Sequence, residues 1–103
     1  MYQIGVYVPE SHSEIVKNMM FDAGAGKLGF YDRCCFEYKG IGQFRPLTGS
    51  SPFLGNQNVV EKVVEVKIEM ICQEEVLGNV ISALKTSHPY ETPAYYVIKL
   101  VNI

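Results

Sequence analysis

The chain has 103 residues and a formal net charge of −2, with 48% hydrophobic and 19% charged residues. This length and composition predict a single folded domain over residues 1–103 and exclude a disordered chain. The few Lys and Arg residues are scattered, which argues against a nucleic-acid partner. No apolar run approaches the roughly 20 residues of a membrane-spanning helix, so no membrane partner is expected.

The N-terminal residues and the cysteines indicate the cellular compartment. The N-terminus lacks a basic region followed by an apolar core, so it does not resemble a signal peptide. The cysteines are Cys34, Cys35 and Cys72, an odd number that includes an adjacent pair. Adjacent cysteines do not form an ordinary disulfide, and no CxxC motif suggests redox activity. We therefore expect reduced thiols in a cytoplasmic protein.

The first part of the chain predicts a strand and then a helix. Residues 2–8 alternate in the manner of a strand, which Pro9 ends. Ser11 and Glu14 have the spacing of a capping box, so a helix should follow and stop at Gly24. The apolar face of this helix comprises Ile15, Val16, Met19, Met20 and Ala23.

Glycines punctuate the middle of the chain. The glycine-rich run 24–29 follows a helix, whereas a phosphate-binding loop precedes one, so the run predicts a helix cap and a tight turn. Residues 30–38 form the next extended run, and Gly40 and Gly42 suggest a hairpin or a bulged strand. Residues 48–58 form a long loop that carries two apolar residues, Phe53 and Leu54.

The second part of the chain predicts another strand, helix and strand. Residues 61–72 alternate clearly, and a helix is expected over residues 73–87. Pro89 ends this helix, and the last strand runs over residues 94–101. The apolar face of the strand comprises Val64, Val66, Ile68, Met70 and Cys72. The apolar stripe of the helix comprises Val76, Leu77, Val80, Ile81 and Leu84.

The element order and the last strand together predict a fold and an interface. The order β-α-β-β-α-β predicts an α+β, ferredoxin-like (split βαβ) antiparallel sheet with two helices on one face. The last strand is apolar on both sides, with Tyr95 and Val97 on one side and Tyr96 and Ile98 on the other. We expect a second copy of the chain to cover the open sheet face, including Tyr95 and Val97. The alternative is that the segment 39–58 folds over that face.

Several long motifs resemble one family across nearly the whole chain. They are Val8-Pro9-Glu10-x-His12-x-Glu14, Ala23-Gly24-Ala25-Gly26, Tyr31-Asp32-x-Cys34, Gly40-x-Gly42-x-Phe44-x-Pro46 and His88-Pro89-Tyr90-Glu91-x-Pro93-Ala94-Tyr95. The sequence resembles the insert domain of YqfO-type proteins in the Nif3-like dinuclear-metal group, and the stand-alone proteins of that type. The resemblance implies a CutA-like or PII-like fold that trimerises.

The resemblance does not imply an enzyme. In the larger relatives, the two metal ions are bound by histidines and carboxylates of another domain. This chain has only two histidines and none of those segments, so the hydrolase-like activity suggested for the larger proteins is not expected here. The sequence also pairs no nucleophile with a base at usable spacing.

His12, His88 and Glu91 are the candidate metal ligands. Imidazole and carboxylate groups suit zinc or copper, so a divalent metal is the one cofactor that the residues suggest. We expect strand pairing to hold the two histidines apart within one subunit, so that they would meet only across an interface. The alternative is that His88 interacts with the last carbonyls of its helix and that His12 is solvated.

Tyr90, Glu91, Phe53 and Leu54 are the candidate ligand-binding residues. The first two lie in a turn bracketed by prolines, which could instead be a rigid turn in which Tyr90 packs and Glu91 pairs with a cation. The other two lie in the long loop, which could lock neighbouring subunits, close on a ligand or plug the open sheet face. An oligomeric binding or regulatory module, with a trimer favoured and a ligand site between subunits, is the first hypothesis. A metal-binding protein is the second.

Overall fold

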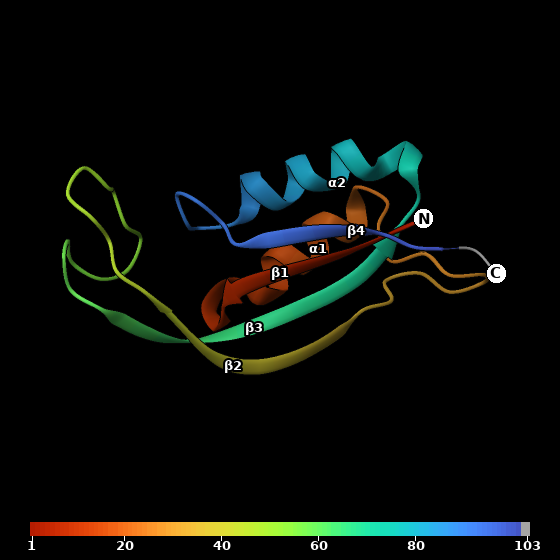
Figure 1. The fold of residues 1–103 in the computed structure, drawn as a ribbon. Coiled ribbons are helices and arrows are strands. Elements are labelled where there is room, and N and C mark those ends of the chain that lie inside the picture. Colours follow the sequence, from red (N-terminus) through yellow and green to blue (C-terminus); the bar gives the residue numbers. More distant parts are fainter. Residues whose placement is uncertain (102–103) are drawn as a thin grey trace.

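A four-stranded antiparallel sheet with the strand order β2-β3-β1-β4 carries two α-helices on one face (Figure 1). The computed structural model describes residues 1–101. The elements are β1 (Tyr2–Pro9), the 3-10 turn η1 (Glu10–His12), α1 (Ser13–Asp22), β2 (Phe36–Phe44), β3 (Glu61–Cys72), α2 (Glu74–Ser87) and β4 (Tyr95–Lys99). This order and topology confirm the predicted ferredoxin-like fold. No helix within residues 1–101 is both long and apolar enough to span a membrane.

Strand β1 is one of the two central strands of the sheet. It pairs with β3 from Tyr2 opposite Cys72 to Pro9 opposite Glu65, and with β4 from Tyr2 opposite Lys99 to Val6 opposite Tyr95. The β4 pairing is extended by a hydrogen bond of 3.1 Å from the Tyr7 amide to the Ala94 carbonyl. Because both pairings are antiparallel, the end of β1 lies beside the start of β4 and the turn that precedes it.

The core lies between the sheet and the helices. Alternate residues of β1 and β3 point toward the helices because side chains in a strand alternate between faces. The buried residues on the strands are Ile4, Val6, Val8, Val66, Ile68, Met70 and Cys72, and those on the helices include Val16, Met20, Phe21, Val80 and Leu84. Burial of these side chains is the main favourable contribution to folding.

The start and the packed face of α1 differ from the prediction. The capping box is wrong because residues 10–12 form a separate 3-10 turn, and the Ser11 hydroxyl bonds to His12 Nδ1 at 2.9 Å instead of to the backbone. Ile15 and Met19 are exposed, because α1 packs through Val16 and Met20, with Phe21 in the core beside them. The buried stripe of α1 is therefore centred on Val16 and Met20, about one residue further along the chain than expected.

Strand β2 is one continuous strand without a bulge, which corrects the hairpin or bulge expected at Gly40 and Gly42. Its register with β3 is unbroken from Phe36 opposite Glu69 to Phe44 opposite Glu61. Residues 30–35 of the expected extended run lie outside β2. Tyr31 instead pairs with Leu28 in a tight turn, through backbone hydrogen bonds of 2.8 and 3.0 Å.

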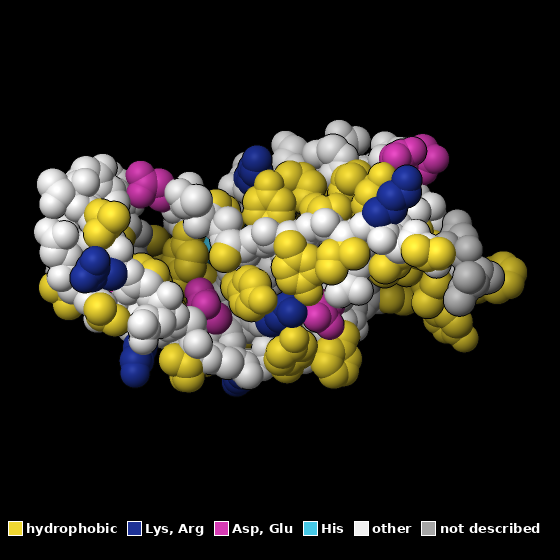
Figure 2. Space-filling model, viewed as in Figure 1, with side chains coloured by type: hydrophobic (Ala, Val, Ile, Leu, Met, Phe, Trp, Pro, Cys, Tyr) yellow, Lys and Arg dark blue, Asp and Glu magenta, His cyan; other side chains and the backbone are white. Residues whose placement is uncertain are grey.

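The open face of the sheet presents aromatic and apolar side chains around one lysine (Figure 2). The Lys67 ammonium lies 5.4, 5.8 and 5.0 Å from the ring centres of Tyr7, Tyr38 and Tyr96, within range of cation–π attraction. Phe36 is 66% exposed and Ile98 is 49% exposed on this face. The loop between β2 and β3 leaves both uncovered, so it does not plug the face.

The side chains of β4 point to the opposite faces of the sheet from those expected. Tyr95 pairs with Val6 and packs against the core, and Val97 pairs with Ile4 on the helix side. The expected exposure of Tyr95 and Val97 on the open face is therefore wrong. Tyr96 and Ile98 occupy that face instead, because strand register decides which alternate residues point to the helices.

The substitution Leu84→Asp should abolish folding. Leu84 is fully buried on α2, and an unpaired carboxylate there costs several kcal/mol, comparable with the total stability of about 5–15 kcal/mol for a domain. Circular dichroism and thermal melting test this. Asn79→Asp places a carboxylate on an exposed position of the same helix and should remain folded. A Leu84→Asp variant with an unchanged melting temperature would show that the helix face is misassigned.

Candidate functional site

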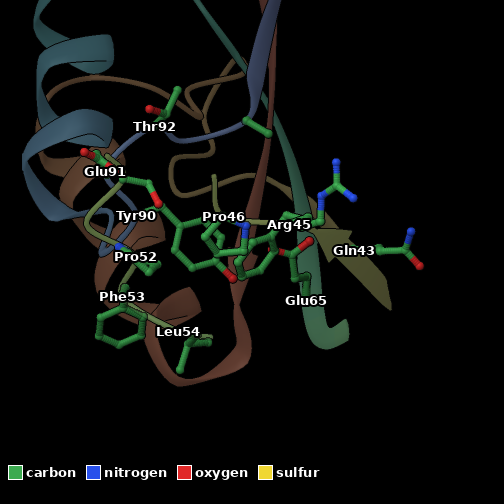
Figure 3. Close-up of a pocket in the computed structure, with 13 residues that line it drawn as sticks. Gln43, Arg45, Pro46, Pro52, Phe53, Leu54, Glu65, Tyr90, Glu91 and Thr92 are labelled. Carbon is green, nitrogen blue, oxygen red and sulfur yellow. The ribbon is translucent and has the colours of Figure 1, made fainter. Parts of the chain in front are cut away.

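A pocket of about 240 Å³ lies where the loop over residues 45–60 meets the turn over residues 88–94 (Figure 3). All four residues predicted to bind a ligand line this one pocket, from two separate segments of the chain. The lining residues are Gln43, Phe44, Arg45, Pro46, Ser50, Pro52, Phe53, Leu54, Glu65, Tyr90, Glu91, Thr92 and Ala94. The structure thus brings the predicted residues together, and ligand binding by them remains a prediction.

His88 fixes the turn against the end of β1. Its Nε2 lies 2.7 Å from the Tyr7 carbonyl, and its Nδ1 lies 3.1 Å from the Tyr90 amide nitrogen. The carbonyl can only accept and the amide can only donate, so the ring is the neutral tautomer with its proton on Nε2. Burial lowers the pKa of His88, which favours this neutral form. The side chain does not cap its own helix, contrary to the alternative considered for it.

Tyr90 is the central side chain of the pocket. Its ring centre lies 4.9 Å from that of His88, 5.8 Å from that of Phe44 and 6.3 Å from that of Phe53. Its hydroxyl oxygen is buried and has no hydrogen-bond partner among the described residues. Burial raises the pKa of Tyr90, and the nearby Glu65 carboxylate raises it further, so the hydroxyl stays protonated at neutral pH.

The Glu65 carboxylate approaches the Tyr90 hydroxyl without meeting the geometry of a hydrogen bond. Figure 3 shows Tyr90 and Glu65 turned toward the pocket, whereas Gln43 and Arg45 extend away from it. A methyl group on Gly42 would overlap the Glu65 carboxylate. The glycine therefore leaves the space in which this carboxylate lies.

The loop is held over the turn by contacts at its tip. The Ser51 amide donates a hydrogen bond of 3.1 Å to Glu91 Oε2, so Glu91 pairs with a backbone amide and not with a cation. The Phe53 ring packs edge-on against His12 with 5.3 Å between ring centres. Phe53 nevertheless stays 46% exposed, at the rim of the pocket.

The two histidines lie at the same end of the sheet, which corrects the expected separation. Antiparallel pairing sets the end of β1 beside the start of β4, and a chain of ring contacts runs from His12 through Phe53 and Tyr90 to His88. Both ring nitrogens of His88 are already hydrogen-bonded. Within residues 1–101, no group of three or more His, Cys, Asp or Glu side chains is placed to hold a metal ion. The metal site thus remains a prediction, and the geometry does not favour it.

The sequence did not single out Glu65 or Phe44 as site residues. Glu65 alternates with buried residues on β3 and looks like an ordinary solvent-facing charge. One signal was available in the Gly-x-Gly of β2, since Gly40 is paired directly with Glu65 and Gly42 clears the space for its carboxylate. Glycine inside a strand often marks a close approach by another group.

Comparison with known proteins gives strong matches to part of a larger protein. The chain is 43% identical to a GTP cyclohydrolase 1 type 2 homolog of Halalkalibacterium halodurans, over 99% of this chain and 27% of that protein. The crystal structure of a Bacillus cereus protein related to NIF3 matches with a TM-score of 0.83 and 40% identity, over 98% of this chain and 26% of that one. No family model matches the sequence.

The chain is thus similar to one segment of a GTP cyclohydrolase 1 type 2 homolog and of a protein related to NIF3. It spans about a quarter of the length of the curated relatives that it matches. The fold of this chain is also that of CutA: the PII-like protein CutA from Nostoc sp. PCC 7120 matches with a TM-score of 0.68 and 18% identity, over 97% of this chain and 81% of that one. The predicted family resemblance and the CutA/PII-like fold are both confirmed.

Stability should fall below neutral pH because of His88. Its folded-state pKa is lowered, so the unfolded chain binds more protons between the folded-state pKa and the unfolded value of about 6.5. The stabilising contribution is complete above about pH 6.5 and is lost as the pH falls through the lowered pKa. Urea unfolding at a series of pH values measures this loss.

Two variants separate His88 from other groups. His88→Gln should be less stable at pH 7.5 and should lose most of the pH dependence between pH 6.5 and 5. His12→Gln removes the other histidine and should keep most of it, since burial is the main cause of the His88 shift. If the stability of His88→Gln depended on pH as steeply as that of the native protein, this would contradict a neutral His88 ring with both nitrogens hydrogen-bonded.

Proposed function

We propose that this NIF3-related segment is a non-enzymatic binding or regulatory module of CutA/PII-like type that holds a small molecule in the pocket between the 45–60 loop and the 88–94 turn. One observation carries the proposal: Tyr90, whose buried hydroxyl has no hydrogen-bond partner within residues 1–101, lines a pocket together with Phe44, Phe53 and Leu54. Apolar pockets with a few converging polar groups are the usual form of small-molecule sites.

The pocket suits a small ligand. Its volume of about 240 Å³ is below the roughly 300–1,000 Å³ typical of sites for drug-sized molecules. A buried hydroxyl without a partner costs about 1–3 kcal/mol, and a ligand that bonds to it would recover this free energy. The Ser51–Glu91 hydrogen bond gives the loop a defined closed position over such a ligand.

We also propose that the module assembles with copies of itself, with a trimer favoured. The open sheet face carries Phe36 and Tyr38 exposed on β2 and Ile98 exposed on β4, the two edge strands, with Tyr7 of β1 between them. Exposed apolar patches of this kind usually mark interfaces. The pocket adjoins this face through Glu65 and Ala94, which also line a hollow on it, so a neighbouring subunit could complete the site.

Ligand binding should depend on Phe53. A thermal-shift screen of small metabolites, including amines, carboxylates and nucleotides, should find compounds that raise the melting temperature of the native chain. Phe53→Ala removes a wall of the pocket at a half-exposed position, so it should abolish those shifts with little change in the melting temperature of the free protein. Val60→Ala, at an exposed position of the same loop outside the pocket, serves as the control. Shifts that persist in Phe53→Ala would place the ligand elsewhere.

Assembly should depend on the open face. Light scattering of the native protein at micromolar concentration should give a mass that is a multiple of 11.6 kDa. Ile98→Asp places a charge in the proposed interface and should yield a folded monomer, because an unpaired buried charge opposes association. Ser82→Asp adds the same charge on an exposed position of α2 and should leave the assembly intact. A native protein that is monomeric at this concentration would refute the assembly.

A further inference from the structure

Two carboxylates and one guanidinium are the charged groups among the residues that line the pocket. Glu65 is turned toward the pocket, whereas Arg45 and the carboxylate of Glu91 point away from it (Figure 3). None of these three side chains forms an ion pair with another described residue. The interior therefore offers an unneutralised carboxylate to a ligand, and the one cation of the wall is directed elsewhere.

The aromatic walls also favour a positively charged ligand. The rings of Phe44, Phe53 and Tyr90 are in mutual contact through Tyr90, with ring centres 5.8 and 6.3 Å apart. Aromatic faces attract cations through their quadrupole, and they also pack against the apolar body of a ligand. A carboxylate beside such rings is the combination that recognises an organic cation.

The Tyr90 hydroxyl can assist the carboxylate. Its oxygen can accept a hydrogen bond from a ligand N–H. Gly42 keeps the Glu65 carboxylate in this position, because any side chain there would displace it. Two oxygen acceptors thus lie close together at one wall of a pocket that Phe44, Phe53 and Leu54 also line.

We propose that the ligand of this pocket is a small organic cation, an ammonium, amidinium or guanidinium group on a compact apolar body. The cationic head lies between Glu65 and the Tyr90 oxygen, and the apolar body lies among Phe44, Phe53 and Leu54. This inference rests on the proposed function, since it names the ligand class of the same pocket. A carboxylate ligand is disfavoured by repulsion from Glu65, and a neutral ligand loses the charge-assisted hydrogen bond.

The test compares three probes of matched shape with the native chain. Benzamidine, benzamide and benzoate share a phenyl ring and differ in the charge of the head group. Nuclear magnetic resonance titration of the backbone amides detects affinities down to the millimolar range and reports the site. Benzamidine should shift residues of the 45–54 and 90–94 segments and bind at least about tenfold more tightly than benzamide, the loss expected for one charge-assisted hydrogen bond.

Variants then assign the selectivity to Glu65. Glu65→Gln should weaken benzamidine at least about tenfold and leave benzamide nearly unchanged. Gly42→Ala should have the same selective effect without touching the ligand, because it displaces the carboxylate. Glu75→Gln makes the same chemical change in the first turn of α2, at the end of the molecule that carries the N-terminus, and should change neither affinity (Figure 1).

The outcomes distinguish this inference from the proposed function. If benzamide or benzoate binds as tightly as benzamidine, or if Glu65→Gln leaves benzamidine unaffected, the cation preference is overturned. The pocket itself still stands in that case, provided that Phe53→Ala weakens the compound that binds. If none of the three probes shifts the pocket residues, the cation inference is overturned as well, and the broad thermal-shift screen with Phe53→Ala decides the proposed function independently.

Discussion

The antiparallel pairing of β1 with β4 is the constraint on which the rest of the structure depends. It places the last residues of β1 against the turn that precedes β4, through the Tyr7 amide bonded to Ala94 and the Tyr7 carbonyl bonded to His88. With the turn fixed in this way, the Tyr90 ring is directed toward the loop that joins β2 and β3. The buried, neutral His88 ring thus links the end of β1 to Tyr90, and this link sets the position of one wall of the pocket.

The pocket combines rigid and adjustable parts. The turn is held by proline geometry and by both nitrogens of His88, whereas the loop tip is held to it by the single Ser51–Glu91 hydrogen bond and by the packing of Phe53 on His12. A site built in this way keeps Tyr90 and Glu65 fixed and lets the loop move. Loops are the less stable parts of most folds, and binding segments are drawn from them.

The sequence predicted the fold well because two strand-helix-strand halves carry clear periodicity, as in the alternation of residues 61–72. It failed where tertiary contacts decide: Gly42 lies in a regular strand, where its lack of a side chain makes room for Glu65, and Ile15 is exposed because α1 packs through Val16. Tyr90, Glu91, Phe53 and Leu54 were each predicted from local sequence. Their meeting in one pocket required the register of β1 with β4, and Glu65 could not be told from a solvent-facing charge before that register was known.

The most direct test of the account is the spatial relation between the loop and the turn in the free protein. Nuclear Overhauser measurements on the unliganded chain should show contacts from the Phe53 ring protons to those of both His12 and Tyr90, since the ring centres lie 5.3 and 6.3 Å apart. Those cross-peaks would show that the pocket exists before any ligand binds. A Phe53 ring without contacts to either residue would mean that the loop does not close over the turn, and the pocket on which the proposed function depends would not exist.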